Sequence, residues 1–333
     1  MTQWRSRWSM RGWLLWLGLR RRLREALLRG AARCLGRWGV RMGLPVVPAL
    51  LARLPVAWRG PAYPRSLQNL ALFGLEPDEC RERACRHSAI RLQCALVEHL
   101  YPRHRPVRLR AWIRSIAWVD PHGLWARSAP LLVLAHTGEY WMAVACLVER
   151  HAEATRFVIP IWNFNDELTR SSLKSLEAFG HQVDILDSRA PGTALALARA
   201  IRRGDRVIIF ADLPVSMGGL RSGEPTGGHL FGRAAQFVKG PMFLAAKLGC
   251  DVLLAGHRVQ LGGPGQLHLI EWVASAPAAQ MQVSWARAIE RFLLESPQDW
   301  FYLSRMEAFF QRQQGPAQRL ASLPAELLRR GSR

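Results

Sequence analysis

The sequence predicts an α/β protein. We expect a single domain with a mostly parallel central sheet flanked by helices, preceded by basic amphipathic N-terminal helices. Two observations predict this class. Short apolar runs typical of buried strands alternate with helical segments from residue 131 onwards. The first 60 residues instead carry thirteen arginines against one acid, Glu25, with tryptophans among them. A chain of 333 residues is long enough to bury a substantial core.

Strands are predicted where an apolar run lies between turn signals. The predicted strands are 131–135, 156–161, 183–186, 206–211, 252–255 and 267–271. The predicted helices are 140–150, 165–180, 192–203, 239–249, 281–296 and 300–312. The stretch 65–100 also has a helical pattern, and Glu76-Pro-Asp-Glu79 is typical of a helix start. The glycine-rich stretch 215–228 is expected to be a loop.

Three regions follow from these patterns. Residues 1–60 are expected to form Trp/Arg-rich helices, 61–312 the α/β domain, and 313–333 a C-terminal tail. The apolar run 12–19 is too short for a helix that crosses ~30 Å of hydrocarbon, and arginines follow where a small-residue cleavage site would stand. The N-terminal helices therefore either lie in a membrane interface, with arginines on anionic lipid, or pack on the domain as ordinary basic helices.

The charge and the cysteines limit the possible partners. The net charge is +21, and all but three of the basic residues are arginines. Such a surface suits phosphates, anionic lipid headgroups, nucleic acid or an acidic protein. The alternative interpretation is that codon bias accounts for part of the excess. No helix-turn-helix, zinc-finger or RNA-binding signature is present, so we expect no nucleic-acid partner. The six cysteines lack zinc or CxxC spacing, which predicts reduced core thiols in a cytoplasmic protein and no bound metal.

His136 is the first candidate catalytic residue. It follows the apolar run Leu131-Leu-Val-Leu-Ala135 and precedes a helix, which places it at the carboxyl edge of the sheet, where open α/β sheets bind ligands. Glu139 lies three residues later and is the candidate orienting acid, because a carboxylate can fix the imidazole's tautomer and stabilise its charged form. The alternatives are a structural histidine and a first-turn acid favoured by the helix dipole.

Three further residues are candidates for the wall of a substrate-binding site. Asp212 ends the predicted strand 206–211, although an aspartate there can also cap a turn. Gly232 and Arg233 either hold an anion or form a turn. The loop 218–223 has glycines and one arginine but lacks phosphate-loop spacing. The remaining histidines considered have no metal-ligand spacing and are expected in the core or on the surface: His229, His257 and His268.

Five sequence blocks in a fixed order carry a family resemblance. They are 68–73 with 80–83, 131–138, 203–212, 230–245 and 296–302. Together they resemble the lysophospholipid acyltransferase superfamily, and most closely its branch of late lipid A biosynthesis acyltransferases of the lauroyl/myristoyl type. The second block resembles the family's strand and catalytic histidine, and the third resembles the strand that ends in its Pro-Asp-Gln motif. The resemblance covers roughly residues 60–312.

The resemblance implies a membrane-associated acyltransferase with His136 as general base. Such an enzyme moves a fatty acyl group from an acyl-carrier-protein or coenzyme A thioester to a hydroxyl or amine of a lipid. The acceptor class includes lipid A-like molecules, lysophospholipids and other glycolipids or metabolites, and no cofactor is implied. The expected partners are a membrane lipid and an acidic acyl carrier protein, which a basic surface would attract. The implied location is the cytoplasmic face of a bacterial inner membrane, with peripheral or shallow insertion.

The chain departs from the family pattern at two places. The family carries an acid five residues after the histidine, where this chain has Trp141. Either Glu139 replaces that acid, or the histidine works alone at a rate about 10²–10⁴-fold lower, or the site is inactive. Residues 160–163 lack the family's arginine after this strand, so a non-phosphosugar lipid or a metabolite is as plausible an acceptor. The alternative hypotheses are a catalytically impaired relative that binds acyl chains or an acyl carrier protein, and a basic nucleic-acid or membrane-surface binder.

Overall fold

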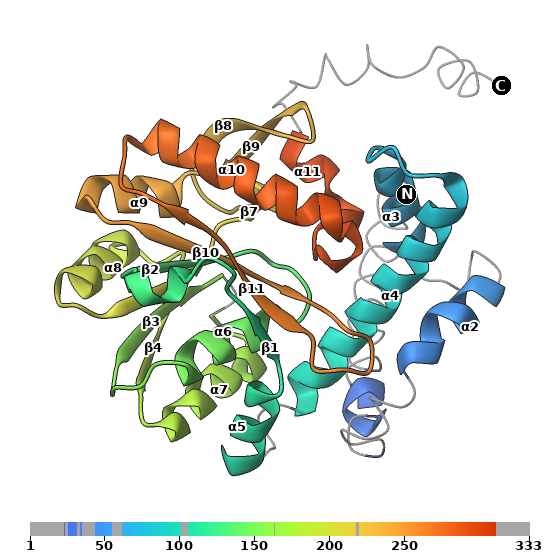
Figure 1. The fold of residues 1–333 in the computed structure, drawn as a ribbon, viewed down its shortest axis with the longest axis horizontal. Helices are drawn as coiled ribbons and strands as arrows, with labels where there is room; N and C mark the ends of the chain where they lie inside the picture. The colour runs from blue at the N-terminus through green and yellow to red at the C-terminus, as the bar shows by residue number, and fades with distance from the viewer. Residues whose placement is uncertain are drawn as a thin grey trace, which may run out of the picture.

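The computed structural model is built on a seven-stranded sheet (Figure 1). It describes residues 62–100, 106–162, 164–217 and 220–310, with residues 23, 26–31, 34 and 44–54 before them. In sheet order the strands are β1 (Ala117–Val119), β11 (Gln266–Val273), β10 (Val252–Arg258), β2 (Leu131–Leu134), β5 (Arg206–Phe210), β3 (Arg156–Ile161) and β4 (Gln182–Asp187). From β10 to β4 all neighbours are parallel, and β11 is antiparallel to β10. The predicted α/β class with a mostly parallel sheet is confirmed.

Helices cover both faces of the sheet. Leu131 and Val133 of β2 belong to the core on one face, and Leu132 and Leu134 belong to the core on the other. The first face is covered by α8 (Thr193–Arg202), α9 (Gly240–Leu248) and α10 (Ala278–Glu295). The second is covered by α5 (Pro106–Arg114), α6 (Tyr140–Glu149) and α7 (Glu167–Lys174). Because successive strand side chains point to opposite faces, burial on both faces explains why β2 is a continuous apolar run.

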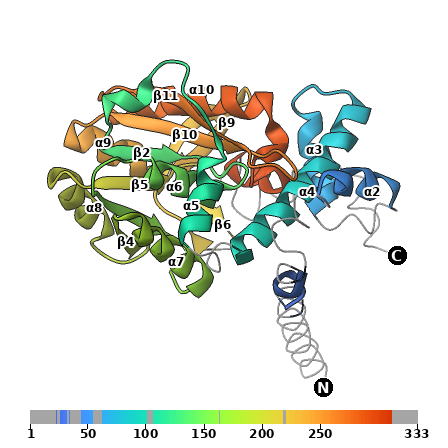
Figure 2. The same cartoon turned by 60° about the horizontal axis from the view of Figure 1, so that its bottom comes forward.

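The helices that precede the sheet in the chain lie beside it. They are α2 (Val47–Arg53), α3 (Ala62–Ala71) and the long α4 (Pro77–Leu100), which Figures 1 and 2 show at the flank of the sheet. The first turn of α4 carries Asp78 and Glu79, which favour a helix start through the helix dipole. The side chains of Arg83 and His87 bond Gln298, so α4 is fastened to the segment that follows α10.

Two predicted elements are wrong. The expected loop 215–228 contains strands, because residues 216–238 form two hairpins, β6 (Ser216–Met217) with β7 (Leu220–Arg221) and β8 (Pro225–Leu230) with β9 (Arg233–Val238). The expected helix 300–312 is replaced by 3-10 turns at Pro297–Asp299 and Leu303–Arg305 and by the short α11 (Glu307–Phe310). Trp300, Tyr302 and Leu303 are all buried, a pattern that one amphipathic helix face does not accommodate.

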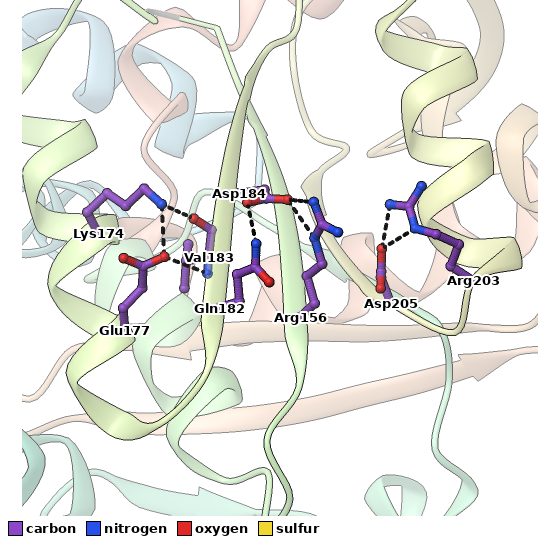
Figure 3. Close-up of polar contacts among 8 residues, drawn as sticks. All are labelled: Arg156, Lys174, Glu177, Gln182, Val183, Asp184, Arg203 and Asp205. Carbon is purple, nitrogen blue, oxygen red and sulfur yellow. Dashed lines mark hydrogen bonds and ion pairs between the residues drawn. The ribbon is translucent and has the colours of Figure 1, made fainter.

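The amino-terminal edge of the sheet is held by ion pairs (Figure 3). Arg156 Nε of β3 lies 2.7 Å from Asp184 Oδ2 of β4, so this pair joins neighbouring strands. Lys174 Nζ lies 2.8 Å from Glu177 Oε1 and donates to the carbonyl of Val183. These carboxylates are paired with basic side chains, so they stabilise the amino-terminal edge of the sheet. Ligand sites of open α/β sheets lie at the opposite, carboxyl edge.

The predicted N-terminal helices and C-terminal tail fall largely on residues that the structure does not describe. Most of 1–60 and all of 313–333 lie outside the described residues. Among the residues that are described, no helix is both long and apolar enough to cross a bilayer. The cysteines are free thiols, but Cys34 is exposed, so the expectation that all of them lie in the core is wrong for this residue.

Candidate active site

His136 lies in the loop that joins β2 to α6, at the carboxyl edge of the sheet. Its side chain is mostly buried, with 13% of its surface exposed. The Phe301 N–H donates to the His136 carbonyl at 2.8 Å, and Thr137 forms an isolated β-bridge with Trp300. The segment after α10 therefore holds the histidine loop against the edge of the sheet.

Asp212 is the carboxylate that contacts the imidazole. It follows β5, the parallel neighbour of β2, so both residues emerge at the same edge. Its Oδ1 lies 2.7 Å from His136 Nδ1, and both carboxylate oxygens accept from the His136 backbone N–H at 2.9 Å. The Trp300 indole N–H donates to Asp212 Oδ2 at 3.0 Å. Trp300 and Asp212 are each 1% exposed, so this carboxylate is fixed by three surrounding donors.

This contact determines the tautomer of His136. An ionised carboxylate only accepts hydrogen bonds, so Nδ1 carries the hydrogen and Nε2 carries the free lone pair. No described residue hydrogen-bonds His136 Nε2. An imidazole held in this way can accept a proton at Nε2 while the carboxylate stabilises its charged form.

Aromatic rings surround the imidazole. The ring centroids of Phe210, Tyr140, Tyr302 and Phe301 lie 4.3, 5.1, 5.3 and 6.1 Å from that of His136. Burial raises the pKa of Tyr140, and burial together with the Asp212 carboxylate raises that of Tyr302. Both phenols therefore stay neutral at physiological pH. The low polarity of this wall strengthens the His136–Asp212 interaction.

Glu139 does not orient His136, and that prediction is corrected. Its Oε1 accepts from Gln93 Nε2 at 2.5 Å, and Gln93 Oε1 accepts from the Gly262 N–H at 3.1 Å. The Glu139 backbone N–H donates to His257 Nδ1 at 3.2 Å. Glu139 is the N-cap residue of α6, with φ −86° and ψ 69°. Because His136 precedes the helix, helical spacing does not bring the two side chains together, and the carboxyl group turns towards α4.

Glu139→Gln is expected to remove a pH-dependent loss of stability. Burial raises the pKa of Glu139 from its ordinary 4.5 to about 7, partly opposed by the Gln93 hydrogen bond. Between these two pKa values the Glu139 carboxyl group keeps its proton in the folded state and loses it in the unfolded state. Stability therefore falls as pH rises from about 4.5 to 7, by about 3 kcal/mol in all. Urea unfolding at pH 5 and pH 8 should show the variant gaining about that much relative to wild type. A difference that is independent of pH would contradict this assignment.

Gly232 and Arg233 lie at the β8–β9 turn and do not contact His136. Gly232 has φ +69°, which the tight turn requires. The Arg233 guanidinium lies 4.0 Å over the Phe310 ring and 3.5 Å from Glu307, so it faces α11. No hydrogen bond or ring contact joins either residue to His136 within the described part of the chain. The expected placement of this pair in the wall of the site is therefore not seen.

The other sequence candidates are the glycine-rich loop and three histidines. Residues 218–219 of the glycine-rich loop are outside the described residues. His229, His257 and His268 lie on β8, β10 and β11. In the described residues, no group of three or more His, Cys, Asp or Glu side chains is arranged to hold a metal ion.

Trp300 is a further residue of the candidate site, and its position in the sequence predicts no role for it. Its indole fixes Asp212, and its ring packs 5.2 Å from Phe309 and 6.1 Å from Phe231. Trp300 does lie in the block 296–302, one of the five that carry the resemblance, so the segment itself is marked in the sequence. The sequence pattern does not indicate that Trp300 bonds Asp212, because the two residues are 88 positions apart in the chain.

No protein-family model matches the chain, and no curated protein sequence matches it.

Proposed function

We propose that this chain is a membrane-associated acyltransferase that uses His136 as general base and Asp212 as its orienting acid. The observation that carries the proposal is the 2.7 Å contact between Asp212 Oδ1 and His136 Nδ1 at the carboxyl edge of the sheet. It leaves Nε2 as the basic nitrogen in a mostly buried, aromatic site. The lack of the family's acid at Trp141 favours a catalytically impaired relative, and the Asp212 carboxylate at the imidazole supports an active site instead.

The proposed reaction needs one base and one acyl thioester. His136 Nε2 takes the proton from an acceptor hydroxyl or amine as its oxygen or nitrogen attacks the thioester carbonyl. The tetrahedral intermediate collapses, the carbon–sulfur bond breaks, and the imidazolium returns the proton to the leaving thiolate. Asp212 stabilises the imidazolium that forms between these steps. The products are the acylated acceptor and the free thiol of the carrier.

Charge and exposed apolar residues support the proposed donor and location. We place an acyl carrier protein or coenzyme A thioester as donor, because a +21 surface favours acidic or phosphate-bearing partners. No residue of α2 is buried, and Val46 and Leu50 at this helix are each 55% exposed. These features support peripheral or shallow attachment to the cytoplasmic face of a bacterial inner membrane.

Acyl transfer should be detected by mass spectrometry of lipids and metabolites from cells that produce the full chain. Wild type is expected to yield a product with one added acyl group, and His136→Ala is expected to lose it. His229→Ala is the matched control, because His229 is exposed on β8 and is not among the side chains that contact the His136 ring in the described residues. Product that persists in folded His136→Ala would sink the proposed mechanism.

Membrane attachment is expected to depend on anionic lipid. Flotation of the full chain with phosphatidylglycerol vesicles should recover most of the protein in the lipid fraction. Raising the salt to about 1 M should release much of it, because screening then acts over about 3 Å. Equal recovery with neutral phosphatidylcholine vesicles, or none with either, would contradict attachment through the basic helices.

A further inference from the structure

One stripe of α4 faces the candidate site. Arg83, His87, Arg91, Cys94 and Glu98 follow one another at three- and four-residue spacing, so they share a face of the helix. The Cys94 thiol donates to the Gly138 carbonyl at 3.1 Å in the histidine loop, and the His87 ring contacts the carbonyl of Gln298 at 2.8 Å. The stripe therefore lies along the two segments that hold His136.

Arg91 is stacked beside the catalytic pair. Its guanidinium carbon lies 3.7 Å from the centre of the Phe301 ring, and that ring is 6.1 Å from the His136 ring. The Arg91 charge also acts on Tyr140 and Tyr302, where it opposes the rise in pKa that burial causes. The Phe301 ring thus separates the Arg91 guanidinium from the His136 imidazole. The guanidinium also acts on Tyr140 and Tyr302, two of the rings that surround the imidazole.

Among the described residues, no ion pair neutralises the charge of Arg91, because no carboxylate lies at ion-pair distance from its guanidinium. Glu98 is close enough to feel the charge, but burial and the Asp166 carboxylate raise the pKa of Glu98 to about 7. A guanidinium stacked on a ring keeps its in-plane N–H donors available, and their fork matches phosphate oxygens.

We propose that Arg91 binds a phosphate group of the acyl acceptor and so places the acceptor's nucleophile at His136. The assignment to the acceptor follows from distance, since the base must touch the acceptor and the cation is only one ring away. The phosphate of a phosphopantetheine donor lies at the far end of a long arm from its thioester. The role of Arg91 in placing the acceptor at His136 rests on the proposed function, whereas the binding of a phosphate group by Arg91 does not.

The test is direct binding, measured by isothermal titration calorimetry on the full chain. The probes are decyl phosphate, uncharged decyl glucoside and 4′-phosphopantetheine. Arg91→Ala is expected to raise the Kd for decyl phosphate by about 10–100-fold, as expected for losing a hydrogen bond to a charged group, and to leave decyl glucoside unchanged. Arg91→Lys, which keeps the stem and charge, should lose less. Arg81→Ala is the matched control, because Arg81 is exposed on the same helix and pairs with Asp78.

A second readout locates the probe. Decyl phosphate should protect His136 from diethyl pyrocarbonate in wild type and Arg81→Ala, and fail to do so in Arg91→Ala. Equal affinity of wild type and Arg91→Ala for decyl phosphate would overturn the inference, and so would equal loss of both decyl ligands. Loss confined to 4′-phosphopantetheine would overturn the assignment to the acceptor. None of these measurements needs catalytic turnover. If decyl phosphate binds in an Arg91-dependent way to a chain that transfers no acyl group, the phosphate subsite is supported and only the proposed function is refuted.

Discussion

Asp212→Asn is expected to lower the rate of acyl transfer by about 10²–10⁴-fold while the protein stays folded. An asparagine amide can donate to His136 Nδ1, which favours the tautomer with its hydrogen on Nε2, and the base then has no free lone pair where the acceptor binds. The Asp212→Asn substitution also removes the negative charge that stabilises the imidazolium. The measurement is the initial rate with purified full chain, an acyl thioester and the acceptor identified by mass spectrometry.

Glu139→Gln is the matched comparison for that experiment. Both changes replace a buried acid with its amide, but only the Asp212 carboxylate touches the imidazole. We expect the Glu139 variant to keep its rate within about threefold of wild type, since it removes no transition-state contact. The opposite ranking, with Glu139→Gln inactive and Asp212→Asn active, would restore Glu139 as the orienting acid.

Gly138→Ala is expected to lower the free energy of unfolding by about 3 kcal/mol and to displace the histidine loop. Gly138 has φ +54°, and a Cβ there would lie 2.6 Å from both the Nδ1 and the backbone carbonyl of His257. The carbonyl belongs to β10 and cannot rotate away, so the loop between His136 and Glu139 must move. Urea unfolding of the variant measures the loss.

The control for this prediction is Gly249→Ala. Gly249 has φ +62°, close to that of Gly138, but a Cβ there meets nothing within 4 Å. The Gly249→Ala change should therefore lower the free energy of unfolding only by the strain of the left-handed conformation, about 1 kcal/mol. Equal losses at the two positions would show that the close approach of Gly138 to His257 is not what demands a glycine.

Most of the sheet could be predicted from the sequence because its central strands, such as β2, β3 and β10, are apolar on both faces. Runs such as 156–161 stand out between turn signals, and β3 has those bounds. The β8–β9 hairpin was missed because its glycines are typical of loops. Gly228 instead makes room for the Phe237 ring, which a Cβ would approach to 3.0 Å. Such a contact depends on the partner strand, which a single segment does not reveal.

The candidate site was predictable in its residues but not in their pairing. His136 and Asp212 were both found because each ends an apolar strand. That β2 and β5 are neighbours depends on strand order, which does not follow from sequence spacing, so the acid nearest in the chain, Glu139, was chosen instead. Arg91 gave no signal at all, since an arginine in a polar helix is typical of a solvated face.

The most direct test of the His136–Asp212 pair is a double-mutant cycle on the rate of acyl transfer. It compares wild type, His136→Ala, Asp212→Asn and the double variant under one set of conditions. If Asp212 acts through His136, the double variant should be no slower than His136→Ala, because groups that act as a unit are non-additive. Losses that multiply, or a wild-type chain that transfers no acyl group, would contradict the account.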